Sequence, residues 1–420
     1  MVKADMSSFI SWIDLSDEDQ KRARDYLRSL AEGTLDELGF GVIRDTFADI
    51  FFPATSTIMT RARYYILVPS IHIYVLQQEL TGSKAQKKCD KIEKHLRRTL
   101  IANKSIKNAR KENVQRYPAS IYWAGLRRLK ILRQTGSQAR YFSQLESHFS
   151  NHVLIKDDDK NTHLEHEGGE LWHPELVQLY DGGHIPKPVH DHEFDEDVDF
   201  RVRPVEAKFL KARFLDDPFE TVISNVFKKD SFENAAYPWD WDYPASLERQ
   251  MTHARHFSMI SKIATLFYYQ MVNDRRVELG KPSIERDVAE IIEHWFAVAR
   301  TELVQWKIED FLLWAEEENC LRRNDFVFFT KFLKSIRSSV SAKNFSQSNA
   351  VQNLIFERER AKRPSKRRLM PGRFQNEWKL PGQFEGYFSV PEHLKFHLNF
   401  RSGIASQIVG EIFEGLADVG

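Results

Sequence analysis

Residues 84–102 read KAQKKCDKIEKHLRRTLIA, and this stretch is the most informative guide to the fold class. Its apolar residues recur every three or four positions, at Ala85, Cys89, Ile92, Leu96 and Leu100. That spacing places them on one face of an α-helix and leaves lysines and arginines on the other face. The stretch therefore predicts an amphipathic helix with a strongly basic outer surface.

Helical patterns run along most of the chain and strand signals are few, so we expect a mainly α protein. A chain of 420 residues exceeds what one hydrophobic core usually serves, which predicts a multi-domain protein. Composition indicates an N-terminal helical domain over residues 1–150, an acidic linker or loop over 151–203 and a C-terminal helical domain over 204–420. Within the last of these, residues 358–379 are expected to form a basic linker.

The formal net charge of +1 hides three strongly charged blocks. Residues 84–133 hold sixteen Lys and Arg against three acids, whereas residues 157–199 hold fourteen acids against two lysines. Residues 358–379 are basic again, with nine cations against two glutamates. An asymmetry of this kind predicts a polyanion such as DNA as the partner. The acidic block could also shield the basic one.

Residues 84–142 predict a basic, winged-helix-like module. Pro118 suits the start of a short helix with one apolar and one cationic face, and Gly136 suits the turn of a wing after it. An ordinary surface helix with a solvated basic face remains the alternative. The expected contacts to DNA are four residues of this helix and its end, Arg127, Arg128, Lys130 and Arg133, and four residues before it, Lys104, Lys107, Arg110 and Lys111.

A second cluster of hydroxyls and arginines suits a phosphate group. Hydroxyls and free backbone N–H groups at a helix start, with arginines one turn later, are typical of phosphate sites. The alternative is that Arg44, Arg61 and Arg63 pair with Asp45 and Asp49 and so join neighbouring helices. The candidate phosphate-binding residues are Thr55, Ser56, Thr57, Arg61 and Arg63.

No grouping of residues predicts a catalytic centre, a cofactor site or a metal site. A nuclease would need carboxylates and a lysine around a metal, and Asp197, Asp199, Glu206 and Lys208 match this only superficially. Pro204 places Glu206 in the first turn of a helix, where its charge meets the positive end of the helix dipole. Five histidines in the acidic segment are more readily explained as a solvated cluster than as metal ligands: His163, His166, His184, His190 and His192.

The compartment follows from features that are missing from the sequence. The two cysteines, Cys89 and Cys320, cannot build a disulfide framework, which indicates a reducing environment. We find no signal peptide and no apolar run long enough to span a bilayer. The sequence therefore predicts a cytoplasmic protein that does not bind membranes.

Several blocks resemble a bacterial domain-of-unknown-function family, the one numbered sixty-three sixty-one. The strongest are FISWIDLSDED from Phe9, LGFGVIRDTFAD from Leu38 and FPATSTIMTRARY from Phe52. Ser120–Leu126, Leu171–Pro174 and Arg401–Leu416 are similar too. Such families usually carry glycine where this chain has Ala54. The resemblance implies a genomic setting in anti-phage islands, beside helicases and phospholipase-D-type nucleases, and implies no catalytic residues.

These observations together predict a non-catalytic, DNA-binding accessory subunit of a bacterial anti-phage (antiviral) defence complex. Its partners would be DNA and the helicase or phospholipase-D-type nuclease subunits of the same system. Two alternatives remain open: a protein–protein scaffold or adaptor for a helicase or nuclease, and a nuclease of unrecognised type.

Overall fold

The computed structural model is built from α-helices, as the sequence predicts. It describes residues 38–102, 117–158, 171–189, 194, 197–278, 280, 283, 287–321, 323–341, 349–362 and 396–418. An isolated β-bridge joins Leu132 and Trp172. The helices are α2 (Gly41–Phe51), α3 (Tyr64–Gln77), α4 (Gly82–Ala102), α5 (Pro118–Arg128), α6 (Gln138–Asp158), α7 (Pro174–Asp181), α8 (Pro204–Leu215), α9 (Val222–Phe227), α10 (Glu248–Glu278), α11 (Asp287–Glu302), α12 (Ile308–Glu317), α13 (Arg323–Ser341), α14 (Asn349–Lys362) and α15 (Ser402–Ala417).

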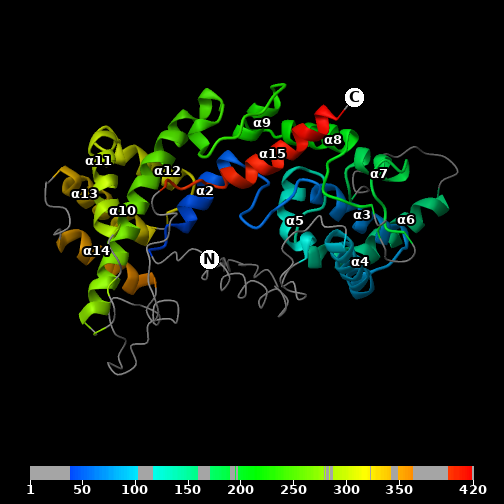
Figure 1. The fold of residues 1–420 in the computed structure, drawn as a ribbon. Coiled ribbons are helices and arrows are strands. Elements are labelled where there is room, and N and C mark those ends of the chain that lie inside the picture. The colour runs from blue at the N-terminus through cyan, green and yellow to red at the C-terminus, as the bar shows by residue number, and fades with distance from the viewer. Residues whose placement is uncertain are drawn as a thin grey trace, which may run out of the picture.

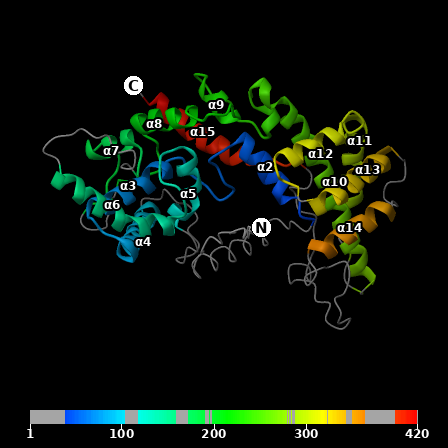
Figure 2. The same cartoon turned by 180° about the vertical axis from the view of Figure 1, so that it is seen from behind.

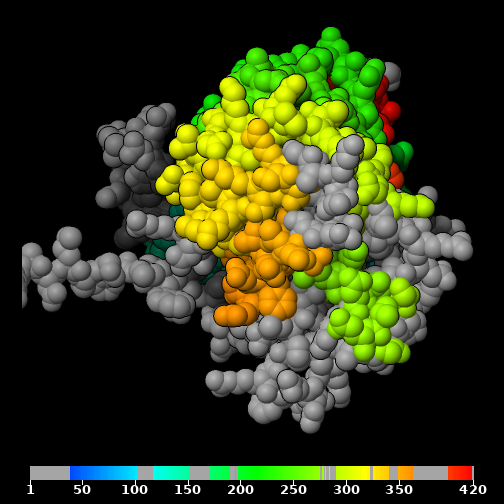
Figure 3. Space-filling model, turned by 90° about the vertical axis from the view of Figure 1, so that its left-hand side faces the viewer, coloured from blue at the N-terminus to red at the C-terminus, as the bar shows by residue number. Residues whose placement is uncertain are grey.

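The helices gather into two lobes with a bridge between them (Figures 1 and 2). Helices α3 to α7 form one lobe, in which α3 packs against α4 and α5, and α4 packs against α6. Helices α10 to α14 form the other lobe, and α13 and α14 lie next to each other on the face that Figure 3 shows. Helices α2, α8, α9 and α15 lie between the lobes. No helix of the described ranges combines the length and apolar character that crossing a membrane requires.

Helix α4 has the two faces that its sequence predicts. Ala85, Cys89, Ile92, Leu96 and Leu100 are all buried against the lobe. Full burial of a leucine or isoleucine side chain, such as Ile92, Leu96 or Leu100, stabilises a fold by about 1.5–3 kcal/mol. The apolar stripe therefore fixes how α4 is rotated about its axis, and so which residues it exposes.

Helix α2 of the bridge packs on the second lobe through an aromatic residue, Phe47. The ring of Phe47 stacks on Trp314 of α12, with centroids 4.1 Å apart and an interplanar angle of 8°. The ring centroids of Phe47 and Phe257 of α10 lie 6.0 Å apart. Helix α2 belongs by sequence to the expected N-terminal domain of residues 1–150, but it packs on helices of the C-terminal one.

The position of α5 depends on a tight turn before α3. Ala54 adopts a φ of 66°, in the left-handed region that favours glycine. Its carbonyl oxygen accepts a hydrogen bond of 2.6 Å from the hydroxyl of Tyr65. A Cβ at Gly125 of α5 would lie 2.4 Å from the same oxygen. A glycine-like turn is thus made here by Ala54, and α5 packs directly on it.

The segment expected as an acidic linker, residues 151–203, is partly folded. Helix α6 continues to Asp158, and α7 begins at Pro174. Trp172, Leu176 and Tyr180 are buried in the core, and the indole N–H of Trp172 donates to the hydroxyl of Tyr141 at 3.2 Å. These three apolar residues have helical spacing, but the acids around them hid the pattern. Residues 171–189 are therefore part of the first lobe.

The winged-helix module expected over residues 84–142 is not confirmed. After α5 the chain does not form a hairpin, because Leu132 pairs with Trp172 and α6 starts at Gln138. The backbone N–H of Arg133 donates to Leu171 O at 3.0 Å. Gly136 does adopt a positive φ, of 112°, but it makes a short turn into α6.

The basic linker expected over residues 358–379 begins inside α14, which ends at Lys362. Arg358 is buried, and its Nε donates to the carbonyl oxygen of Leu38 at 2.7 Å. Its guanidinium also pairs with Asp325. The rest of that segment lies outside the described residues.

Candidate nucleic-acid interface

The outer face of α4 carries a row of cations. The exposed charged residues of this helix follow a spacing of three and four positions, so they lie along one line of its surface. At 1.5 Å per residue this line is about 21 Å long. We call it the basic stripe, and it consists of Lys84, Lys87, Lys91, Lys94 and Arg98.

The stripe is not neutralised by its own helix. Every fully exposed charged residue of α4 is a cation, since Asp90 is half-buried and Glu93 is buried. No residue in the described ranges forms an ion pair with any member of the stripe. An ordinary solvated helix face mixes charges of both signs, and this one does not.

Glu93 lies on the opposite, buried side of α4 and holds the start of α5. Its Oε1 accepts a hydrogen bond of 2.7 Å from the backbone N–H of Ala119, in the first turn of α5. Burial raises the pKa of Glu93 to about 8, the hydrogen bond from Ala119 opposing this shift. The buried carboxyl thus attaches α5 directly to the helix that bears the stripe.

The four cations expected to contact DNA at the end of α5 are all exposed. Arg127, Arg128, Lys130 and Arg133 follow one another at this end of the helix, and we call them the α5 cluster. Two of them face carboxylates of the loop after α8. Arg128 Nη2 lies 2.8 Å from Asp217, and Lys130 Nζ lies 3.4 Å from Asp216.

These acids do not come from the block of residues 157–199 that the charge pattern pointed to. In the described part of that block, Asp199 binds Arg63, and Asp181 accepts a hydrogen bond of 3.0 Å from Gln77. The four other cations expected to contact DNA lie outside the described residues: Lys104, Lys107, Arg110 and Lys111.

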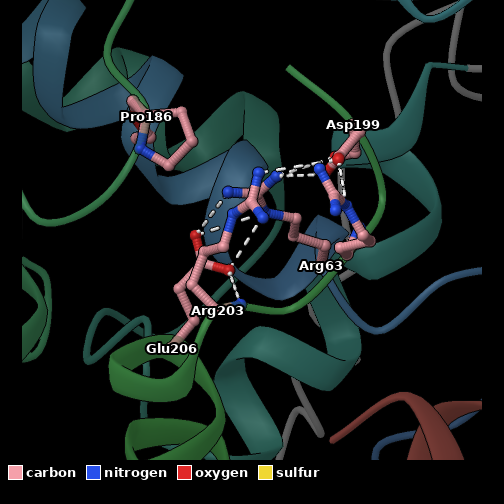
Figure 4. Close-up of polar contacts among 7 residues, drawn as sticks. Arg63, Pro186, Asp199, Arg203 and Glu206 are labelled. Atoms are coloured by element: carbon pink, nitrogen blue, oxygen red, sulfur yellow. Dashed lines mark hydrogen bonds and ion pairs between the residues drawn. The ribbon is translucent and has the colours of Figure 1, made fainter. Parts of the chain in front are cut away.

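Arg63, a candidate phosphate ligand, is instead bound by carboxylates of its own chain (Figure 4). Its Nη2 lies 2.9 Å from Glu206 Oε1, and its Nη1 lies 2.9 Å from Asp199 Oδ1. The side chains of Arg63 and Glu206 are 3% and 0% exposed. Burial opposes ionisation of Asp199, but its pKa is still lowered, because Arg201 donates hydrogen bonds to it and the charges of Arg203 and Arg63 lie close by. The cluster joins α3 to the start of α8.

The remaining phosphate candidates differ in their surroundings. Thr55 is buried, and its Oγ1 donates to the carbonyl oxygen of Phe52 at 2.6 Å. Arg61 Nη1 lies 2.7 Å from Glu411 of α15 and is partly exposed. Thr57 is exposed and Ser56 half-buried. Phosphate binding stays a prediction, and it would have to rest on Ser56, Thr57 and Arg61. Of the arginines in the alternative, Arg61 and Arg63 pair with Glu411, Glu206 and Asp199. Arg44 does pair with Asp45, its neighbour in sequence, at 3.0 Å.

The residues weighed for nuclease chemistry are not brought together as a metal site. Glu206 begins α8 and accepts a hydrogen bond of 2.8 Å from the backbone N–H of Arg203, in addition to binding Arg63. Lys208 is exposed on α8. Within the described ranges, no group of three or more His, Cys, Asp or Glu side chains has metal-binding geometry. Of the five histidines considered, only His184 lies in those ranges.

A family model, described as "Family of unknown function (DUF6361)", matches residues 6–420. The chain belongs to the DUF6361 family. No curated protein and no solved structure matches it. Since the DUF6361 family carries no assigned activity, inference about function has to start from the surface of the molecule.

The basic stripe of this DUF6361 protein could have been found from sequence. Its five members share helical spacing within the block that the charge count selected, yet the count alone did not separate them from their neighbours. Two other residues of this surface, Glu93 and Asp217, could not be recognised from a sequence pattern. Glu93 looks like one more surface acid of α4, and Asp217 looks like one more loop acid.

Proposed function

We propose that this DUF6361 protein is a DNA-binding accessory subunit of a multi-protein complex, with no catalytic centre of its own. The observation that carries the proposal is the basic stripe of α4, a row of five exposed cations that have no ion-pair partner among the described residues, on a helix whose other face is buried. The exposed α5 cluster supports it, because α5 is attached to α4 through Glu93 and Ala119.

A straight row of cations suits a nucleic-acid backbone. Duplex DNA carries one negative charge per about 1.7 Å of its axis, so a row of about 21 Å meets several phosphates. Contacts to phosphates fix the position of a protein on DNA and carry little sequence information. The stripe therefore supports binding with little preference for base sequence.

The proposed partners are the helicase or phospholipase-D-type nuclease subunits of an anti-phage system. The genomic setting that the family resemblance implies is the support for these partners. Val304, Leu313 and Val327 of the C-terminal lobe are exposed to more than half of their area. Single exposed aliphatic residues are ordinary on a protein surface, so they do not by themselves favour the second candidate function, a protein–protein scaffold. Both functions can reside on one chain, since the stripe and these residues belong to different lobes.

The direct test replaces three cations of the stripe by glutamine. We expect the Lys87→Gln, Lys91→Gln, Lys94→Gln variant to bind duplex DNA about tenfold to a hundredfold more weakly than wild type at low salt, because three phosphate contacts are lost. Fluorescence anisotropy with a labelled duplex of arbitrary sequence measures the dissociation constant.

A matched triple variant provides the control. Lys307, Lys331 and Lys334 are exposed cations of the other lobe, and their replacement by glutamine removes the same total charge. We expect the control variant to bind as wild type does. Equal weakening of the two variants would mean that net charge alone governs binding. No binding by wild type at low salt would exclude the proposal and leave the scaffold function.

A further inference from the structure

The loop between α8 and α9 carries an aromatic ring that the fold does not cover. Phe219 is 68% exposed, the largest value among the big apolar side chains of the described residues. Leu215, at the end of α8, is 39% exposed. Single exposed apolar residues are ordinary on protein surfaces, so the surroundings of the ring decide what it can bind.

A buried carboxylate holds the ring in place beside α5. Asp217 Oδ1 accepts a hydrogen bond of 3.0 Å from the backbone N–H of Phe219, which fixes the loop in a tight turn. The same carboxylate lies 2.8 Å from Arg128, and its side chain is only 4% exposed. Asp217 therefore attaches the loop to the end of α5, and the ring is positioned before any partner arrives.

The ring is flanked by cations of the α5 cluster. The guanidinium of Arg128 lies 5.8 Å from the centroid of the Phe219 ring. Lys130, two residues further on, faces Asp216 of the same loop and is exposed, as is Arg133. The pair between Lys130 and Asp216 is an exposed one, which costs little to open. The guanidinium of Arg128 lies over one face of the ring, and the 68% exposure of Phe219 leaves the rest of the ring open beside groups that can receive phosphates.

This combination matches the way proteins bind single strands. Bases of a single strand stack on aromatic side chains while a basic surface follows the phosphates, and this mode tolerates any sequence. A duplex keeps its base faces stacked inside and offers none of them to a ring on a protein surface. The ring of Phe219 consequently favours unpaired nucleic acid over a duplex.

We propose that Phe219 stacks on an unpaired base, with the α5 cluster on the adjoining phosphates, so that this surface is a binding site for single-stranded DNA. The inference rests on the proposed DNA binding and adds to it the strand form of the ligand. In a complex with a helicase, this site would hold one strand of an opened duplex.

The test compares Phe219→Ala with wild type on two probes, a labelled oligothymidylate and a labelled duplex of equal length. Removing a stacked aromatic should weaken binding to the single strand by about fivefold to about a hundredfold. Binding to the duplex should change by less than twofold. Phe219→Trp should retain single-strand affinity, because tryptophan keeps an aromatic face, whereas Phe219→Leu should not. Leu313→Ala, an exposed apolar residue of the other lobe, is the control.

The outcomes separate this inference from the proposed function. Loss of single-strand binding in Phe219→Ala and Phe219→Leu, with recovery in Phe219→Trp, supports stacking. Unchanged single-strand binding in Phe219→Ala, with weak binding by the α4 triple variant, overturns stacking and leaves DNA binding standing. Single-strand affinity of Phe219→Leu equal to that of wild type would show an apolar contact without stacking, and it would also overturn the inference. Absence of binding to both probes by wild type overturns the proposed function and the inference with it.

Discussion

At the scale of single residues, Arg63 shows how far a sequence motif can be trusted. Two arginines shortly after a run of hydroxyls suit a phosphate, but Arg63 binds Glu206, which lies 143 positions further along the chain. No local pattern links two such distant residues, so sequence could not reveal the pair. It did locate Glu206 correctly at the start of a helix, where it also accepts from the backbone of Arg203.

We predict that Glu206→Gln destabilises the protein strongly. The substitution leaves the buried guanidinium of Arg63 without the more deeply buried of its two counter-charges, and breaking a buried ion pair in this way costs about 3–5 kcal/mol. Thermal unfolding followed by circular dichroism should show a clearly lower Tm. Glu220→Gln is the matched control, because Glu220 pairs with Lys228 at the surface. A Tm equal to that of wild type would mean that the Arg63 cluster does not hold α3 and α8 together.

At the scale of helices, the outcome of sequence interpretation depended on how well each apolar pattern stood out. Helix α4 was predictable, because its five buried apolar positions have helical spacing and cations lie between them. Helix α7 was not predictable, because its buried residues Leu176 and Tyr180 stand among acids that indicate a linker. The winged-helix module expected around α5 is not confirmed, for a different reason. Leu132 pairs with Trp172, forty positions away, and that pairing depends on the tertiary fold.

The attachment of α5 to α4 gives a prediction about pH. Burial raises the pKa of Glu93 to about 8 from an ordinary value of 4.5. Between these values the unfolded chain loses the proton that the folded protein keeps, so Glu93 makes the protein less stable as the pH rises through this window. Glu93→Gln removes this titration and can still accept from Ala119. We expect the variant to gain stability relative to wild type from pH 5 to pH 9.

Urea denaturation at several pH values measures this difference. The exposed Glu414→Gln, on α15, should follow wild type at every pH. A constant difference between Glu93→Gln and wild type would show that Glu93 has the same protonation in the folded and unfolded chain, against the expectation from its burial.

At the scale of the whole molecule, the sequence predicted the fold class but not how the helices are arranged in space. A mainly α fold and a basic surface followed from spacing and charge counts. The arrangement of two lobes with α2 and α15 between them did not follow from the sequence. It depends on contacts between residues far apart in the chain, such as the stacking of Phe47 on Trp314. The net charge of +1 was the least informative number of all, since cations of the stripe and acids elsewhere cancel in the sum.

The salt dependence of DNA binding tests the central claim, that the basic stripe of α4 receives phosphates. Each phosphate contact on duplex DNA contributes about 0.9 to the slope of log K against log salt, and about 0.7 on single strands. Over about 50–200 mM salt, the Lys87→Gln, Lys91→Gln, Lys94→Gln variant should show a slope shallower than wild type by about 2 to 3. The Lys307, Lys331, Lys334 control should run parallel to wild type. Parallel lines for both variants would contradict the claim and move the DNA-binding surface away from α4.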